Sequence, residues 1–156
     1  MTELKNTVQT WDLRYLDLAL MIASWSKDPS TKVGCIIVDR ERRPMSWGYN
    51  GFPKGIPDHE EFLNNREQKY KCVIHAEQNA ILFSRTSDLM GCTVYITHCP
   101  CSQCAASLIQ LKVSRVVTFV QPDFELRWAE SLTVTKDLLD SAKIQYIAYT
   151  KLNVIK

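Results

Sequence analysis

Residues 92–104 read Cys-Thr-Val-Tyr-Ile-Thr-His-Cys-Pro-Cys-Ser-Gln-Cys, and residues 75–80 read His-Ala-Glu-Gln-Asn-Ala. In the first stretch an apolar run typical of a buried strand leads to Pro100, a residue that favours the first turn of a helix. In the second stretch His75 comes directly before a segment rich in helix formers. Both stretches therefore place metal-binding side chains at the start of a predicted helix.

Together the two stretches contain one imidazole and two thiols, from His75, Cys101 and Cys104. A structural zinc site usually has four protein ligands, whereas a catalytic site has three and leaves the fourth position to a water whose pKa falls to about 7. Two thiolates and a neutral imidazole also balance the charge of Zn²⁺. Glu77 is too close to His75 in the chain to bind the same ion easily, so we expect it to transfer protons.

The local helical pattern supports this arrangement. Residues 102–111 have helical periodicity, so Cys101 and Cys104 are expected to lie on one face and to reach the same ion. The positive end of the helix dipole favours their thiolate forms. The pattern H-x-E…P-C-x-x-C that results is the signature of zinc deaminases.

The C-x-x-C motif alone leaves other interpretations open. It is also typical of a redox pair or of half of a four-ligand structural zinc site. The upstream His-x-Glu at a helix start, and the strand that leads into Pro-Cys, favour a catalytic site. Cys99 adjoins the motif, and we expect it to line the site rather than to bind the metal.

Composition sets further limits. With 156 residues and 46% hydrophobic content, the chain is expected to form a single domain over residues 1–156, with a core at about 11–149. No signal peptide and no membrane-spanning stretch are recognised, so a cytoplasmic location is expected, and six cysteines suit that reducing compartment. The net charge of +2 is too small for wrapping around a nucleic acid, but it permits a local site for one phosphate.

Hydrophobic periodicity predicts alternating helices and strands. Helices are expected at residues 11–26, 76–85, 102–111 and about 125–142, and strands at 32–38, 45–49, 92–97, 114–120 and 144–149. The first two strands are predicted to form a hairpin, and residues 50–71 a loop-rich stretch. The later strands follow β-α-β units, so they should be parallel. The expected fold is α/β, a three-layer α/β/α sandwich around a mixed five-stranded sheet.

From about residue 11 to 149 the chain resembles the deoxycytidylate (dCMP) deaminase family, within the cytidine deaminase-like superfamily. The metal-binding motifs are shared across that superfamily. A more selective mark is Gly-Tyr-Asn-Gly-Phe-Pro-Lys-Gly at residues 48–55, followed by a long insert before the histidine. Ser-Thr-Lys-Val-Gly at residues 30–34 and Ile-Gln at residues 109–110 also match. The resemblance implies a cytidine deaminase-like fold and a free deoxynucleotide as substrate.

The resemblance also implies roles for single residues, beyond the ligands and the proton carrier named above. Asn50 matches an asparagine directed at the sugar and base, although an Asn-Gly pair is also a common turn. The backbone N–H of Ala76 is expected to meet the pyrimidine carbonyl. Lys32 and Arg127 match positions where cationic side chains bind the 5′-phosphate, and each has a plain alternative as a solvated surface charge.

The implied reaction is zinc-dependent hydrolysis of dCMP to dUMP and ammonia, which supplies the precursor for dTMP synthesis. Other substrates stay open at this point, namely dCTP, a C5-modified dCMP, or a base in tRNA or single-stranded DNA; a noncatalytic zinc-binding module is a more distant alternative. Many relatives are homohexamers regulated by dCTP and dTTP, with Mg²⁺ beside the effector. A hexamer is therefore expected, with a dimer as the alternative, and neither a membrane nor a nucleic acid is expected as a partner.

Overall fold

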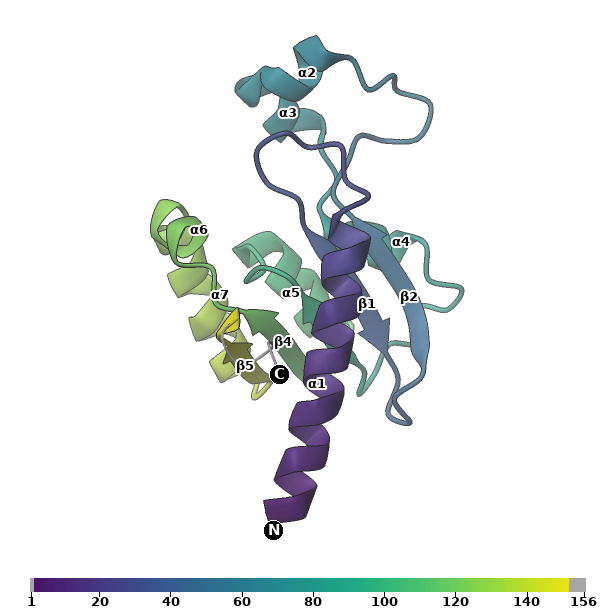
Figure 1. The fold of residues 1–156 in the computed structure, drawn as a ribbon, viewed down its shortest axis with the longest axis vertical. Helices are drawn as coiled ribbons and strands as arrows, with labels where there is room; N and C mark the ends of the chain where they lie inside the picture. Colours follow the sequence, from purple (N-terminus) through teal and green to yellow (C-terminus); the bar gives the residue numbers. More distant parts are fainter. Residues whose placement is uncertain (1, 152–156) are drawn as a thin grey trace.

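Five strands form one mixed sheet in the order β2-β1-β3-β4-β5 (Figure 1). The computed structural model describes residues 2–151, with side chains from Thr7 onward. The strands are β1 (Gly34–Val38), β2 (Pro44–Tyr49), β3 (Thr93–Ile96), β4 (Arg115–Phe119) and β5 (Gln145–Tyr149). Strand β1 pairs antiparallel with β2 and with β3, whereas β3, β4 and β5 are parallel. The predicted mixed sheet, its hairpin and its parallel later strands are confirmed.

Helices cover both faces of the sheet (Figure 1). They are α1 (Thr2–Ala23), α2 (Glu60–Asn64), α3 (Arg66–Cys72), α4 (Ala76–Leu82), α5 (Ser102–Gln110), α6 (Pro122–Arg127) and α7 (Ala129–Ser141). One buried cluster joins α1 to one face, where Leu16 and Phe119 are fully buried. A second cluster joins α4, α5 and α7 to the other face, around Leu108 and Leu139. This arrangement is the expected three-layer α/β/α sandwich.

Two predicted helices were wrong in their bounds. Helix α1 begins at Thr2 instead of Trp11, because the apolar periodicity that marks a buried helix face is sparse before that tryptophan. The helix expected at 125–142 is two helices, since Pro122 starts α6 early and the backbone at Trp128 is not helical.

None of the helices in residues 2–151 combines the length and the apolar character that crossing a membrane requires.

A third difference lies in the stretch 50–71, where two short helices, α2 and α3, replace part of the predicted loop. Asn65 caps α3, because its side chain accepts a hydrogen bond from the backbone N–H of Gln68 at 3.2 Å. This Asn-x-x-Gln spacing is a helix-start signal that the glycines and prolines nearby obscured. Helices α2 and α3 project beyond one end of the sheet, on the side where β1 begins (Figure 1).

Helix α4 packs very closely on β2, and this contact places the histidine and glutamate of the motif. A Cβ atom on Gly48 would lie 2.5 Å from the carbonyl oxygen of Ala76 and 2.5 Å from the amide nitrogen of Ala80. The Ser46 hydroxyl donates a hydrogen bond to the Ala80 carbonyl at 2.6 Å. The Asn79 side chain donates to a β2 carbonyl at 2.8 Å. The backbone of α4 is therefore held at a separation that only glycine permits.

Replacing Gly48 by Ala is expected to force α4 away from the sheet and to lower the free energy of unfolding by about 1–3 kcal/mol, the usual effect of overpacking. Zinc binding should weaken as well, because α4 carries one ligand at its start. Gly51→Ala is the matched control, since a Cβ atom there meets nothing within 4 Å. Chemical denaturation and zinc titration measure both effects; equal stability of the two variants would contradict the proposed packing role.

Candidate metal centre and active site

Two helix starts form the metal centre at the edge where the parallel strand β3 ends. His75 is the N-cap of α4 and Cys101 the N-cap of α5, both with extended backbone, and Cys104 lies in the first turn of α5. The Nδ1 atom of His75 is 3.5 Å from Sγ of Cys101 and 3.4 Å from Sγ of Cys104. The three ligand atoms all lie within 4.8 Å of one another.

These separations fit one zinc ion. Zinc bonds of about 2.0 Å to nitrogen and about 2.3 Å to sulfur place the nitrogen and sulfur ligands of a tetrahedral site about 3.5 Å apart. Within the described part of the chain, no other group of three His, Cys, Asp or Glu side chains is spaced to hold a metal. The donor set contains borderline-soft nitrogen and sulfur, which zinc prefers over the oxygen ligands typical of Mg²⁺.

Neighbouring groups hold the two thiols in place. Gln78 donates hydrogen bonds to Sγ of Cys104 at 3.9 Å and to the Ser107 hydroxyl at 3.1 Å. Hydrogen bonds from the Cys104 thiol and from His75 lower the pKa of Cys101, so this thiol carries negative charge readily, whereas the hydrogen bond to Cys101 and burial raise the pKa of Cys104. Sequence analysis did not assign a role to Gln78. The only signal for it was its place directly after Glu77, on the same short helix.

Glu77 lies in the wall of a cavity that also includes His75 and Cys101. Its side chain is almost fully buried, and burial raises its pKa to about 7 against the opposing effects of its own backbone amide and of His75. A carboxyl group of this kind can accept and return a proton near neutral pH. Glu77 does not belong to the three-residue ligand group, which leaves it available for proton transfer.

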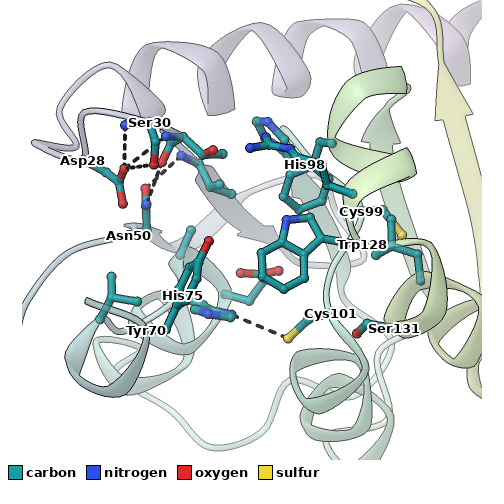
Figure 2. A pocket seen from close by; sticks show the side chains of 18 of the residues that line it. Asp28, Ser30, Asn50, Tyr70, His75, His98, Cys99, Cys101, Trp128 and Ser131 are labelled. Carbon is teal, nitrogen blue, oxygen red and sulfur yellow. Dashed lines mark hydrogen bonds between the residues drawn. The ribbon is translucent and has the colours of Figure 1, made fainter. Parts of the chain in front are cut away.

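The cavity is a cleft between α3, α4, α5 and the α6–α7 junction (Figure 2). Ala76 is fully buried in its wall. Tyr70 from α3 and Trp128 from the α6–α7 junction meet edge to face, with ring centroids 5.7 Å apart. Phe124 lies between Trp128 and His98, whose pKa falls to about 4 through burial and the nearby charges of Lys151 and Arg127. These aromatic residues make one end of the cleft predominantly apolar.

Asn50 lines the cavity and also fixes the segment opposite it. Its Oδ1 atom accepts a hydrogen bond from the backbone N–H of Val33 at 2.8 Å, and its Nδ2 atom donates to the Thr31 carbonyl at 2.9 Å. The side chain is buried, and Figure 2 shows it directed at this segment. The amide still has one N–H and one oxygen lone pair for a ligand. A structural role and a substrate contact are therefore compatible at this position.

The two predicted phosphate-binding cations lie in different places. Arg127 lines the cavity, but Lys32 does not and is exposed. Thr31 and Val33, on either side of Lys32, do line the cavity. Successive side chains of an extended segment point in opposite directions, which turns Lys32 away from the cavity. The structure instead brings Lys69 to this wall, from a helix that sequence analysis took for a loop.

Cys99 also lines the cavity, but it is not part of the ligand group. Its side chain is buried, and burial raises its pKa to about 11, so the thiol stays protonated at neutral pH. A buried glutamate beside one imidazole and two thiols, on a mixed sheet covered by helices, defines the class of zinc-dependent deaminases.

Comparison with known proteins agrees with this class. The family model for the cytidine and deoxycytidylate deaminase zinc-binding region matches residues 9–120. An uncharacterized deaminase of Aliivibrio fischeri is 40% identical over 150 residues, which cover 96% of this chain and 99% of that protein. A probable deoxycytidylate deaminase of Caenorhabditis elegans is 42% identical over 137 residues, covering 85% of this chain and 66% of the nematode protein. The chain therefore belongs to the cytidine and deoxycytidylate deaminase family.

A solved structure shares the fold. The dCMP deaminase of cyanophage S-TIM5, in complex with dCMP and dUMP, matches with a TM-score of 0.69, and the match covers 96% of this chain and 98% of that chain. The two sequences are 24% identical. A tRNA:A34 deaminase matches with a lower TM-score of 0.52 and 19% identity.

Proposed function

We propose that this protein is a zinc-dependent dCMP deaminase that hydrolyses dCMP to dUMP and ammonia and so supplies the precursor for dTMP synthesis. The observation that carries the proposal is the buried Glu77 in the wall of one cavity with His75 and Cys101. The relatives named deoxycytidylate deaminase, such as the mouse enzyme at 37% identity over 112 residues, support the choice of substrate.

The reaction replaces the C4 amine of cytosine with a carbonyl. Different residues of this chain bind the metal and transfer the protons. His75, Cys101 and Cys104 would hold the zinc ion, which would supply a water nucleophile at neutral pH. The Glu77 carboxylate takes a proton from the attacking water and delivers it to N3 of the pyrimidine. After the water oxygen has bonded to C4, Glu77 takes the second proton from this new C4 hydroxyl and delivers it to the amine, which leaves as ammonia when the C4–N bond breaks and the C4 carbonyl forms.

Other residues of the cavity orient the substrate. Ala76 is the first residue of α4, so its backbone N–H has no acceptor within the helix and is free to meet the pyrimidine O2. Asn50 contacts the sugar through the amide hydrogen that its backbone bonds leave free. Arg127 binds the 5′-phosphate from the α6 side of the cleft. Lys32 is not proposed as a phosphate-binding residue, because it is exposed and does not line the cavity.

Ammonia release from a panel of substrates tests the proposal. The protein should deaminate dCMP with a kcat/KM at least about 100-fold above that for deoxycytidine, because a phosphate dianion paired with Arg127 contributes a charge-assisted contact. The panel also includes dCTP, 5-methyl-dCMP and a single-stranded oligonucleotide. Turnover of each substrate is measured alone and again with dCTP or dTTP added as an effector. Preferred turnover of the oligonucleotide, or no turnover of any member by zinc-loaded protein, would refute the proposal.

We also propose a single deaminase domain over residues 1–156, assembled as a homohexamer in the cytoplasm. Exposed apolar side chains at Trp25, Trp47 and Phe83 support assembly, since such residues mark protein contacts when they cluster.

dCTP and dTTP are proposed as effectors, with Mg²⁺ beside the nucleotide. A groove lined by Phe52, Lys54 and other residues that follow the hairpin supports an effector site. None of the six cysteines forms a disulfide, which suits a reducing compartment.

A further inference from the structure

Helix α3 brings one cationic group into the wall of the substrate cavity, and this group is buried. Lys69 is 5% exposed although it lies on a short helix that projects from the sheet. Its Nζ atom forms an ion pair with Oδ1 of Asp28 at 3.2 Å and donates to the Ser30 hydroxyl at 2.8 Å. Both partners precede β1 and also line the cavity. A lysine is almost never buried without such a partner, so the contact joins α3 to the segment before β1.

Asp28 in turn organises the segment that follows it (Figure 2). The same Oδ1 atom accepts hydrogen bonds from the backbone N–H groups of Ser30 at 2.8 Å and Thr31 at 3.0 Å, and from the Ser30 hydroxyl at 2.9 Å. Burial opposes the charge of Asp28, yet the hydrogen bonds from Thr31, Ser30 and Lys69 keep its pKa below its usual value. The turn over residues 28–31 is therefore held by a charged carboxylate.

This turn positions the side chain of Asn50. The Thr31 carbonyl accepts one hydrogen bond from the Asn50 amide, and the backbone N–H of Val33 donates another to its oxygen. These bonds leave Asn50 no freedom to rotate without breaking both of them. A continuous path of contacts thus runs from Lys69 through Asp28 to the Asn50 amide in the wall of the cavity.

The charges at this wall argue against a direct contact between Lys69 and the phosphate. Asp28 already neutralises the ammonium, and a phosphate placed there would meet the carboxylate as well. Arg127 is different, because it takes part in no ion pair among the described residues. A dianion entering the cavity is therefore drawn to Arg127.

We propose that Lys69 is a positioning residue for substrate binding, which acts through Asp28 and the 28–31 turn to hold Asn50 against the sugar. The inference rests on the proposed deamination of dCMP. It assigns a role in substrate recognition to the insert between β2 and α4, because α3 is the element that carries this lysine.

Replacing Lys69 by Met should raise KM for dCMP by about tenfold or more and change kcat by less than about threefold, since the metal centre and Glu77 stay in place. The kcat/KM for deoxycytidine should fall by a similar factor, because a displaced Asn50 affects nucleoside and nucleotide alike. Lys71→Met is the matched control, as Lys71 lies on the same helix in an exposed ion pair with Glu67. It should leave both constants unchanged.

A mutant cycle keeps the test decisive if Lys69→Met folds poorly. In an Asp28→Asn background, which removes the buried charge, Lys69→Met should add little further change in KM, because both residues act along one path. dUMP affinity, measured by calorimetry, gives a readout that does not depend on turnover. The proposal is overturned if Lys69→Met lowers kcat/KM for dCMP but not for deoxycytidine, or if it lowers kcat at constant KM. It is also overturned if the two substitutions have additive effects on KM, or if Lys69→Met leaves the kinetic constants unchanged. If wild-type protein deaminates no substrate, the proposed function fails, whereas dUMP binding still tests Lys69.

Discussion

Replacing Glu77 by Gln is expected to reduce kcat for dCMP by about 10²- to 10⁴-fold, the range that positioned proton transfer contributes in enzymes. Glutamine has nearly the same shape and can keep hydrogen bonds in the cavity, but it cannot take a proton from water or return it to N3. Zinc content should stay at one ion per chain, because Glu77 lies outside the ligand group. Steady-state kinetics and elemental analysis of the same preparation measure both quantities.

Glu130→Gln provides the control for this change, since Glu130 is exposed at the start of α7 and does not line the cavity. Its kinetic constants should match those of the wild type. Thermal unfolding of Glu77→Gln should occur at the wild-type temperature or above it, because the substitution removes a carboxyl group that burial disfavours in its charged form. Full activity in a zinc-loaded Gln variant would show that another group moves the proton.

Replacing Cys101 by Ser should abolish turnover by removing zinc. A serine hydroxyl can still accept the hydrogen bond that Cys101 takes from the backbone N–H of Cys104 as the cap of α5, so the helix start is preserved. A neutral hydroxyl is a much weaker zinc ligand than a thiolate. We expect zinc affinity to fall by more than about 100-fold, beyond the range of changes to groups that only support ligands.

Cys99→Ser makes the same chemical change at a buried thiol two residues away. Its Sγ atom faces the Pro100 carbonyl at 3.8 Å, so a hydroxyl there has an acceptor. Zinc affinity should change by less than about tenfold, because Cys99 is outside the ligand group. Competition with a chromogenic chelator gives both affinities. Equal zinc loss in the two variants would mean that Cys99 belongs to the coordination shell, and retention of zinc by Cys101→Ser would remove Cys101 from it.

The grouping of His75, Cys101 and Cys104 was predictable because short stretches of the chain specify it. A separation of three residues at a helix start brings Cys101 and Cys104 together. His75 and Glu77 lie two residues apart at the start of another helix. The strands were predictable for a similar reason. The apolar runs of β1, β3 and β4 indicate buried strands, and the β-α-β units that join the later strands allow one handedness.

The substrate wall was less predictable, because contacts between distant segments create it. Lys32 and Lys69 are chemically alike, and neither has a local pattern that marks it as buried. The difference arises because Asp28 and Ser30 form a site for the Lys69 ammonium 41 and 39 residues away along the chain. The Tyr70–Trp128 contact has the same origin.

The amino-acid order alone indicated the candidate ligand group of His75, Cys101 and Cys104 and the alternation of strands and helices, since covalent spacing limits each of these choices. Three-dimensional packing settled which lysine faces the cavity, that α3 exists as part of its wall, and that Asn50 is held by the 31–33 segment. A buried charge or amide is stable only if a polar partner offsets the cost of removing it from water. Here that partner comes from a distant segment of the chain, so only the folded structure determines which group is buried.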